Sequence, residues 1–381
     1  MTELLLTNAQ LVLSDRVVRG TLRAQDGQIR DIDESQTTVS DAIDCGGDYV
    51  LPGLVELHSD NMEKHFAPRP GVQWPELSAA IAHDAQMAAA GITTVFDALR
   101  VGDSFRQAEN RGDRFLRMAH AIRDARDNDT FRADHKIHIR CELCHADVIQ
   151  SFEKLSAEPE VCLVSLMDHT PGQRQFVDIG KFAEYYQGKY GLTDNELADY
   201  MRDLKWAHEE YSPPNRERLV EICHGRNLPL ASHDDATVEH VLEAADAGVV
   251  IAEFPTTREA AAAAREKGLA ILMGAPNLVL GGSHSGNVSA LDLARDGNLD
   301  VLSSDYVPVS LLHGVFLLTE SAAEISLPEA VTKASKNPAA SVKLDDRGEI
   351  AIGKRADLIR VRKKGSMPVV TSLWRGGERV L

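Results

Sequence analysis

Short apolar segments alternate with longer stretches of helical periodicity through the middle of the chain. The helical stretch between Pro75 and Gly91 and the Ala-rich stretch before Gly268 end as helices do, with Pro near the start or Gly after the end. Strand and helix repeated eight times predict an α/β fold, a (β/α)8 TIM-like barrel, with its chemistry at the carboxyl ends of the strands. The eight predicted strands are 54–58, 92–97, 137–142, 161–167, 229–233, 249–254, 270–274 and 300–304.

Both ends of the chain have a different pattern, with short apolar runs separated by turn residues. Asp26-Gly27 is a hairpin-type turn, and Gly376-Gly377 separates two short runs near the C-terminus. We therefore expect a small β-sandwich domain built from both termini, residues 1–52 and 345–381, beside a barrel formed by residues 53–344. The N-terminal strands are predicted at 4–6, 10–13, 17–22 and 29–32.

One connection, residues 174–228, is longer than a barrel needs. It contains a capping-box pattern at Thr193 and Glu196, which predicts the start of a helix. We expect that helix to end at Ser212-Pro213-Pro214, because the residue before a proline disfavours helical geometry. Such a segment is either a lid or dimer surface or a passive helical insertion.

Five of the predicted strands end in a His, Asp or Glu. His58 and Asp60 are two residues apart, so on a strand both point the same way. A single histidine there is more often a hydrogen-bonded structural residue, but the strand ends of a barrel surround one mouth. Imidazole and carboxylate groups gathered there predict a divalent metal centre. The polar strand ends are His58-Ser-Asp60, Glu142, Asp168-His169, His233-Asp-Asp235 and Asp305.

Two of these residues have a predicted role in catalysis at such a centre. Two neighbouring ions need an anionic bridging ligand, and Glu142 is the candidate. A divalent ion lowers the pKa of its water to about 7. Asp305 would accept the proton of that water and later pass it to the leaving group. The alternative is that Asp305 caps the helix predicted at 307–318. Mixed His and carboxylate ligands suit zinc, manganese and iron.

The composition of the chain limits the classes of molecule that it could bind and indicates where in the cell it is located. The 381 residues carry a formal net charge of −17, which disfavours nucleic-acid binding. An anionic substrate remains possible, because metal ions and a few basic side chains reverse the potential locally. The N-terminus has no signal-peptide pattern, and the apolar segment 307–318 is too short to span a bilayer. Five cysteines predict a reducing cytoplasm; Cys141 and Cys144 are expected to be buried strand residues. A homo-oligomer is compatible with the sequence.

Three segments carry a resemblance over nearly the whole chain. Residues 51–58 (LPGLVELH), 91–95 (GITTV) and 348–358 (GEIAIGKRADL) resemble the amidohydrolase superfamily. The motifs at 58–65, 281–287 and 303–308 look like one branch, which hydrolyses a phosphonate-bearing ribosyl triphosphate of carbon–phosphorus lyase metabolism. This resemblance implies cleavage at the α-phosphorus, with pyrophosphate leaving and a 5-phosphate remaining. No P-loop motif occurs in the chain.

The resemblance also implies a ligand set with two departures from most of the superfamily. Asp60 stands where a second histidine is usual, and Glu142 where a carboxylated lysine often bridges the metals. The usual histidines come from the fifth and sixth strands, whereas His169 here follows the fourth and the sixth ends at Glu253. Leu280 stands where relatives in the branch often have a basic residue. The implied metal ligands are His58, Asp60, Glu142, His169 and His233.

Phosphate recognition requires cations and backbone N–H groups. The loop 281–286, with Gly282 and His284, is either a phosphate cradle or an ordinary Gly-rich turn. Several basic residues lie at or just after strand ends, where they could neutralise a triphosphate and a phosphonate. The predicted substrate-binding residues are Lys64, His65, Arg69, Arg140, Arg174, Gly282 and His284; Arg100 also lies at a strand end.

Two other functions remain open from the sequence. A cyclic-amide hydrolase, dihydroorotase-like or imidase-like, would use the same metals and Asp305 on a carbonyl group. A non-enzymatic assembly subunit would show no metal dependence and no loss on Asp305→Asn. Lys64 and the segment 281–287 favour the triphosphate hydrolase, and the reaction product discriminates among the three.

Overall fold

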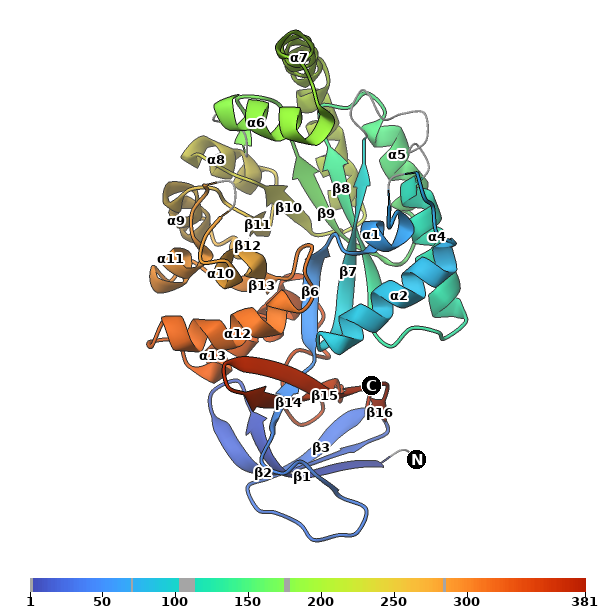
Figure 1. Cartoon of the computed structure of the whole chain (residues 1–381), viewed down its shortest axis with the longest axis vertical. Coiled ribbons are helices and arrows are strands. Elements are labelled where there is room, and N and C mark those ends of the chain that lie inside the picture. The colour runs from blue at the N-terminus through green and yellow to red at the C-terminus, as the bar shows by residue number, and fades with distance from the viewer. Residues whose placement is uncertain (1–2, 70, 103–113, 175–178, 284–285) are drawn as a thin grey trace.

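The computed structural model describes residues 3–69, 71–102, 114–174, 179–283 and 286–381 (Figure 1). The chain forms a barrel of parallel strands surrounded by helices, and a separate sheet lies below it, where both termini are found. His284, one of the predicted substrate-binding residues, lies outside the described residues.

All eight predicted barrel strands are present, and they pair in chain order. The backbone N–H of Asp60 donates to the carbonyl of Asp305 at 3.1 Å, which joins the first strand to the last. The buried Glu56 carboxylate reinforces this junction by accepting from Ser303 Oγ at 2.6 Å. The strands are β6 (Leu54–Ser59), β7 (Ile92–Val101), β8 (Asp134–Glu142), β9 (Val161–Met167), β10 (Leu230–His233), β11 (Ile251–Glu253), β12 (Ala270–Gly274) and β13 (Val301–Ser303).

The inside of the barrel has an apolar layer followed by polar residues at the carboxyl ends of the strands. The apolar layer is one hydrophobic cluster with side chains from every barrel strand except β8, and Phe96 is its largest buried member. Strand residues alternate between the two faces, so two positions further on the inward side chains of β10 and β11 are His233 and Glu253. The strand side chains that point out of the barrel, such as those of Val95 and Val164, belong to the larger cluster beneath the helices.

The outer helices begin where the sequence supplies cap residues. Thr237 and Thr257 each accept a hydrogen bond from the backbone N–H three residues later, and so fix the starts of α8 and α9. The helices around the barrel are α1 (Met62–Phe66), α2 (Glu76–Ala89), α4 (Arg114–Asp127), α5 (Val148–Leu155), α8 (Val238–Asp246), α9 (Arg258–Glu266), α10 (Ala275–Val279), α11 (Ala290–Arg295), α12 (Ser310–Ser321), α13 (Leu327–Thr332) and α14 (Lys336–Ser341).

The second sheet is built from both ends of the chain, as predicted. Its strand order is β16-β15-β14-β5-β1-β2-β3, with β4 paired to β1, and it encloses a cluster that includes Leu6, Leu22 and the fully buried Trp374. The predicted strands 4–6 and 10–13 are one strand with an irregular register between Leu6 and Ala9. The strands are β1 (Glu3–Val12), β2 (Val17–Gln25), β3 (Gln28–Asp33), β4 (Ile43–Asp44), β5 (Tyr49–Pro52), β14 (Leu358–Lys364), β15 (Met367–Arg375) and β16 (Glu378–Arg379).

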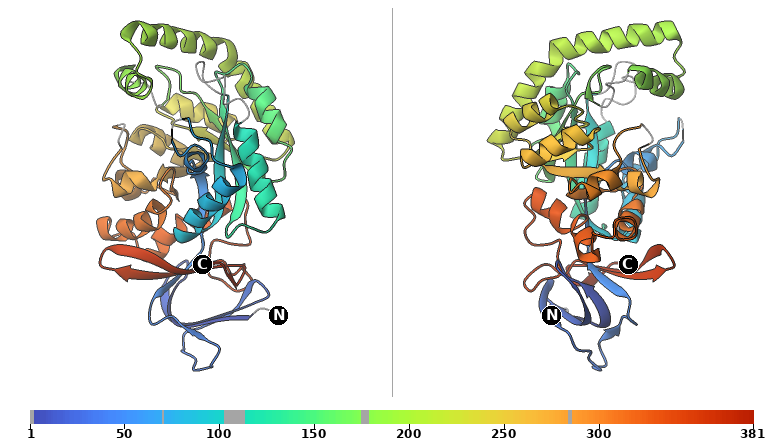
Figure 2. Two further views of the ribbon diagram at one scale, coloured as in Figure 1. Left: turned by 45° about the vertical axis from the view of Figure 1, so that its right-hand side comes forward. Right: turned by 90° about the vertical axis from the view of Figure 1, so that its left-hand side faces the viewer.

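The long connection forms two helices, α6 (Ile179–Tyr190) and α7 (Asp194–Gly225). The predicted capping box at Thr193 is present, but the predicted break at Ser212-Pro213-Pro214 is wrong, because α7 continues through it. Contacts with the barrel hold this part of the helix: Ser212 Oγ donates to Asp168 at 2.8 Å, and Asn215 donates to the carbonyl of Leu143 at 2.9 Å. In Figure 2, α7 crosses the upper end of the molecule and then descends along the barrel.

The apolar segment predicted at 307–318 lies largely in α12, which packs at the junction of the barrel and the terminal sheet. Leu311, Val315 and Phe316 are buried, and the Phe316 ring meets the edge of Tyr49 on β5 at a centroid distance of 5.9 Å. Among the described helices, none combines the length and apolar content required to cross a membrane.

Candidate metal centre at the barrel mouth

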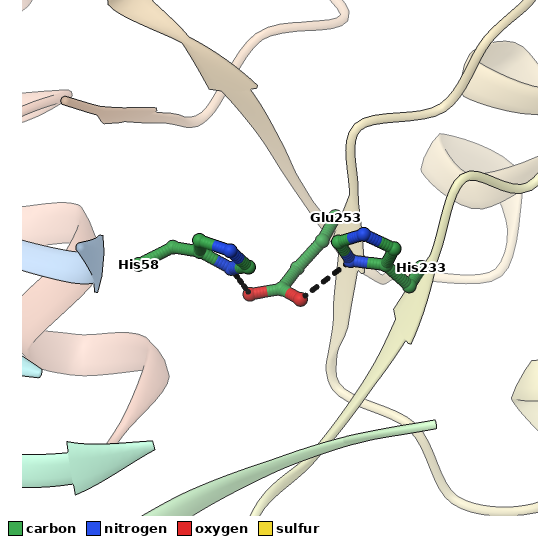
Figure 3. Close-up of side chains that lie close together, drawn as sticks. All are labelled: His58, His233 and Glu253. Atoms are coloured by element: carbon green, nitrogen blue, oxygen red, sulfur yellow. Dashed lines mark hydrogen bonds and ion pairs between the residues drawn. The ribbon is translucent and has the colours of Figure 1, made fainter. Parts of the chain in front are cut away.

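A buried carboxylate lies between two histidines at the carboxyl ends of β6, β10 and β11 (Figure 3). Glu253 Oε1 is 3.1 Å from His58 Nδ1, and Glu253 Oε2 is 3.2 Å from His233 Nδ1. Burial alone would raise the pKa of Glu253, but the nearby His138 and His58 hold that pKa well below its usual range. Glu253 is therefore ionised, and it accepts a hydrogen bond from each ring.

The other ring nitrogens of these histidines face further carboxylates. His58 Nε2 is 3.8 Å from Asp60 Oδ1, and one donor atom each from His58, Asp60 and Asp305 lies within 4.8 Å of the other two. His233 Nε2 is 3.4 Å from Asp234 Oδ2, and His169, His233 and Asp234 form a second such group. Imidazole nitrogens and carboxylate oxygens are the donors that divalent ions prefer, so the residues present fit a metal centre.

Asp305 follows β13 and has a backbone conformation that is uncommon outside glycine, with φ of 53°. Burial, together with the charge of Asp60, raises the pKa of Asp305 to about 7. The alternative prediction, a helix cap, is wrong, because α12 begins at Ser310 and its N-cap residue is Val309. The carboxylate instead lies at the mouth beside His58 and Asp60.

Arg140, on β8, forms an ion pair with Asp60. Its Nη1 lies 2.6 and 2.7 Å from the two carboxylate oxygens, although 80 residues separate the two in the chain. Burial raises the pKa of Asp60, but Arg140 and His58 lower it more, so the net shift is downward. Arg140 was predicted to bind substrate. In the structure its guanidinium group forms an ion pair with the ionised Asp60 carboxylate.

Glu142 lies beside His169. It accepts from His169 Nδ1 at 2.7 Å and from the His169 backbone N–H at 2.9 Å, and Arg100 donates to it at 2.6 Å. His169 Nε2 is 3.9 Å from Asp234, so the histidine after the fourth strand does reach the His233 group. Glu142 as the bridging ligand stays a prediction, since the carboxylate between His58 and His233 is that of Glu253.

The other basic residues predicted to bind substrate differ in whether they form ion pairs. Arg174 is buried and paired with Asp235 and, at 2.9 Å, with Glu243. Lys64 and Arg69 are exposed, and among the described residues neither forms an ion pair; Lys64 Nζ donates to the carbonyl of Tyr306 at 3.0 Å, next to Asp305. Among the described residues, Lys64 is therefore a cation without an ion-pair partner that lies next to the candidate base.

The described contacts of His65 and Gly282, two other predicted substrate-binding residues, are not with the candidate metal ligands. His65 lies 3.0 Å from Gln86 Oε1 and 3.4 Å from Asn61 Nδ2, behind the turn that carries Asp60. Gly282, with φ of 157°, belongs to the turn that follows α10, and Gly282 N–H donates to the carbonyl of Asn277 at 2.8 Å.

Sequence reasoning missed Glu253 and Asp234 as site residues. Glu253 ends an apolar run, residues 249–252, in the same way that the other candidate residues end theirs. The same signal was therefore present at the sixth strand. Asp234 follows His233 directly and was visible in the sequence, but its contact with His169 depends on the curvature of the barrel.

A second cluster of titratable residues lies on the outer side of the barrel wall, between α2 and strands β7 and β8. Asp97 is 2.7 Å from His83 Nε2 and 2.7 Å from His135 Nδ1, and Asp84 is 3.4 Å from His135 Nε2. Burial alone would lower the pKa of His135, but Asp97 and Asp84 raise it to about 9. Burial would raise the pKa of Asp97, but His135 and His83 lower it to about 2. His135 is thus an imidazolium between two carboxylates.

This cluster predicts a loss of stability in alkaline solution. The folded state binds the His135 proton more tightly than the unfolded state, whose ordinary pKa is about 6.5. The resulting stabilisation, on the order of 3 kcal/mol, is complete below about pH 6.5 and is lost as the pH rises through about 9. Chemical denaturation across this range should show the decline in wild type and not in His135→Gln. A parallel decline in both proteins would contradict the assignment.

The comparisons with known proteins agree with this geometry. The profile of the Amidohydrolase family matches residues 76–364, so the chain belongs to the amidohydrolase family, whose members are metal-dependent hydrolases. Over 378 residues, 99% of this chain and 100% of the relative, the chain is 49% identical to alpha-D-ribose 1-methylphosphonate 5-triphosphate diphosphatase of Escherichia coli (strain K12).

Solved structures support the fold independently of close sequence similarity. N-isopropylammelide isopropylaminohydrolase of Burkholderia multivorans superposes with a TM-score of 0.63 at 17% identity, covering 100% of this chain and 98% of that one. N-acetyl-D-glucosamine-6-phosphate deacetylase of Mycobacterium smegmatis gives 0.64 at 16% identity, with 100% of both chains covered. At these identities the likeness establishes the barrel and terminal-sheet fold alone.

Proposed function

We propose that this chain is a metal-dependent diphosphatase that converts alpha-D-ribose 1-methylphosphonate 5-triphosphate to the 5-phosphate and pyrophosphate in phosphonate catabolism. The observation that carries the proposal is the 49% identity, over 99% of the chain, to the diphosphatase of that name. The metal-ligand geometry at the barrel mouth supports hydrolysis, and Lys64, an exposed cation that contacts the Tyr306 carbonyl beside Asp305, favours an anionic substrate.

The residues proposed to hold the metal are His58 and Asp60 in one group and His169, His233 and Asp234 in the other, with Glu142, beside His169, as the proposed bridging ligand. Two groups favour a binuclear centre, and histidine nitrogens favour zinc, with manganese or iron as alternatives. When bound, a divalent ion supplies Lewis-acid polarisation of the phosphoryl group and acidifies water. Arg140 keeps Asp60 ionised and so keeps its oxygens available as donors.

The proposed reaction is a displacement at the α-phosphorus. The oxygen of water forms a bond to that phosphorus, and the bond from the phosphorus to the pyrophosphate oxygen breaks. The proton of the water moves to a carboxylate oxygen of Asp305, which can hold it because its pKa is raised to about 7. The same proton then passes to pyrophosphate. Lys64, held beside Asp305 through the Tyr306 carbonyl, would neutralise charge on the leaving group.

The product of the reaction tests this proposal. Purified protein loaded in turn with Zn²⁺, Mn²⁺ or Fe²⁺ should release pyrophosphate and a ribosyl 5-phosphate from the triphosphate, and chelator treatment should stop the release. The cyclic-amide alternative predicts ring opening of a dihydropyrimidine instead. Ring opening without pyrophosphate, or release of orthophosphate alone, would contradict the proposed function.

A cytoplasmic location is part of the same proposal. All five cysteines are free, including the buried Cys141 and Cys144 of the C-x-x-C segment. Unpaired thiols are typical of proteins kept in a reducing compartment. Cys144 Sγ lies 3.7 Å from Glu142 Oε1, a weak hydrogen bond that gives this cysteine a structural role.

A further inference from the structure

We infer that Glu253 is a positioning residue that fixes the tautomer of both His58 and His233, so that each ring presents a free Nε2 lone pair to the metal. The inference rests on the metal-dependent part of the proposed function and is independent of the substrate. Nothing in the sequence motifs assigns a role to this residue, which ends the sixth barrel strand.

The geometry restricts where the ring protons lie. Each carboxylate oxygen of Glu253 contacts one ring: Oε1 is 3.1 Å from His58 Nδ1, and Oε2 is 3.2 Å from His233 Nδ1. An ionised carboxylate only accepts hydrogen bonds, so in both rings Nδ1 carries the hydrogen. In a neutral ring Nε2 is then bare, and Nε2 is the atom that faces Asp60 in one ring and Asp234 in the other.

Other contacts keep the carboxylate and the rings in this arrangement. Ser165 Oγ donates to Glu253 Oε2 at 2.5 Å, which fixes the carboxylate from the side of β9. The ring of Phe254 meets His58 and His233 edge-on, at centroid distances of 5.0 and 5.5 Å. Phe254 has φ of 54°, an unfavourable conformation for a bulky residue, and its N–H donates to the Leu272 carbonyl at 2.8 Å. The backbone at this point is therefore held in a conformation that brings the carboxylate and the aromatic ring against the same two histidines.

Because one carboxylate accepts hydrogen bonds from two rings, its replacement by an amide in Glu253→Gln should have a specific effect. Glutamine has one acceptor oxygen and one donor nitrogen in place of the two oxygens. In Glu253→Gln one histidine can keep Nδ1–H, whereas the other faces an NH₂ group and must present a bare Nδ1. That ring then carries its hydrogen on Nε2 and loses the lone pair that a metal needs. The substitution removes one ligand nitrogen and leaves the other in place.

Two measurements that do not involve turnover test this inference. Long-range ¹H–¹⁵N spectra of the metal-free protein with labelled histidine, recorded in alkaline buffer where both rings are neutral, report the tautomers. Wild type should show Nδ1–H in both His58 and His233, and Glu253→Gln should show Nε2–H in one of them. Zinc affinity, measured by competition with a chromophoric chelator, should fall by roughly 10–100-fold in Glu253→Gln.

The matched control is Glu349→Gln, in which the altered carboxylate binds Lys336 and Ser14, remote from the mouth. Its histidine tautomers and zinc affinity should equal those of wild type. Nε2–H in either ring of the wild-type protein would overturn the inference, and so would a Glu253→Gln protein that retains both tautomers and full zinc affinity. The wild-type spectrum decides the question even where a variant fails to fold. Absence of pyrophosphate release would refute the proposed substrate and leave these results unaffected.

Discussion

Asp305→Asn is expected to lower the rate of pyrophosphate release by about 10²–10⁴-fold, the range typical for removal of a general base. Asparagine keeps the shape of the side chain and its backbone conformation, since asparagine tolerates positive φ as well as aspartate does. It cannot take up a proton at the position where Asp305, with its pKa of about 7, can. The measurement is the single-turnover rate of pyrophosphate release with saturating metal.

The metal content separates the proposed role of Asp305 from that of an essential ligand. We expect Asp305→Asn to retain near wild-type metal by elemental analysis, because the groups around His58 and His233 keep their other donors. The matched control is Asp292→Asn, which alters a carboxylate on the outer helix α11 and should leave both rate and metal unchanged. An Asp305→Asn enzyme with most of its activity intact would exclude Asp305 as the proton acceptor.

His233→Ala is expected to have the second largest effect, a loss of metal affinity greater than the roughly 10–100-fold that removal of an outer partner costs. His233 lies in a group with His58 and Glu253 and in another with His169 and Asp234, so its removal affects both candidate metal positions. It also leaves the Glu253 carboxylate with an unfilled acceptor position in a buried environment.

Elemental analysis after dialysis against a weak chelator measures this effect. His58→Ala should behave in the same direction, because the His58 ring has the equivalent contact with Glu253. His120→Ala, which changes an exposed histidine on α4, serves as the control and should keep wild-type metal content. Unchanged stoichiometry in His233→Ala would show that the assigned ligands are wrong.

The barrel could be predicted from sequence because its strands are buried on both faces and appear as apolar runs bounded by turn residues. Each of the eight predicted runs corresponds to an observed strand, and the alternation with helices leaves few topologies. The course of α7 could not be predicted, because local proline geometry argued for a break at Pro213. Hydrogen bonds from Ser212 and Asn215 to residues distant in the chain hold the helix together there.

The part of the candidate site that could be predicted consists of residues at the ends of the predicted strands. His58, Asp60 and Asp305 do lie together, since they end strands that meet where the barrel closes. The pairing of Arg140 with Asp60, and of Arg174 with Asp235, depends on side-chain directions across the barrel that no local pattern records. Glu253 was missed because the resemblance implied a histidine ligand at the end of the sixth strand, whereas the residue there is a carboxylate that contacts the histidines themselves.

Anomalous X-ray diffraction from crystals of the zinc-loaded protein tests the central claim most directly. The account predicts a peak at the barrel mouth within about 2.0–2.3 Å of His58 Nε2 or His233 Nε2 and of a neighbouring carboxylate oxygen. The buried His83–Asp97–His135 cluster offers an internal comparison, because it too brings three donor atoms together. A peak only at that cluster, with none at the mouth, would contradict the account.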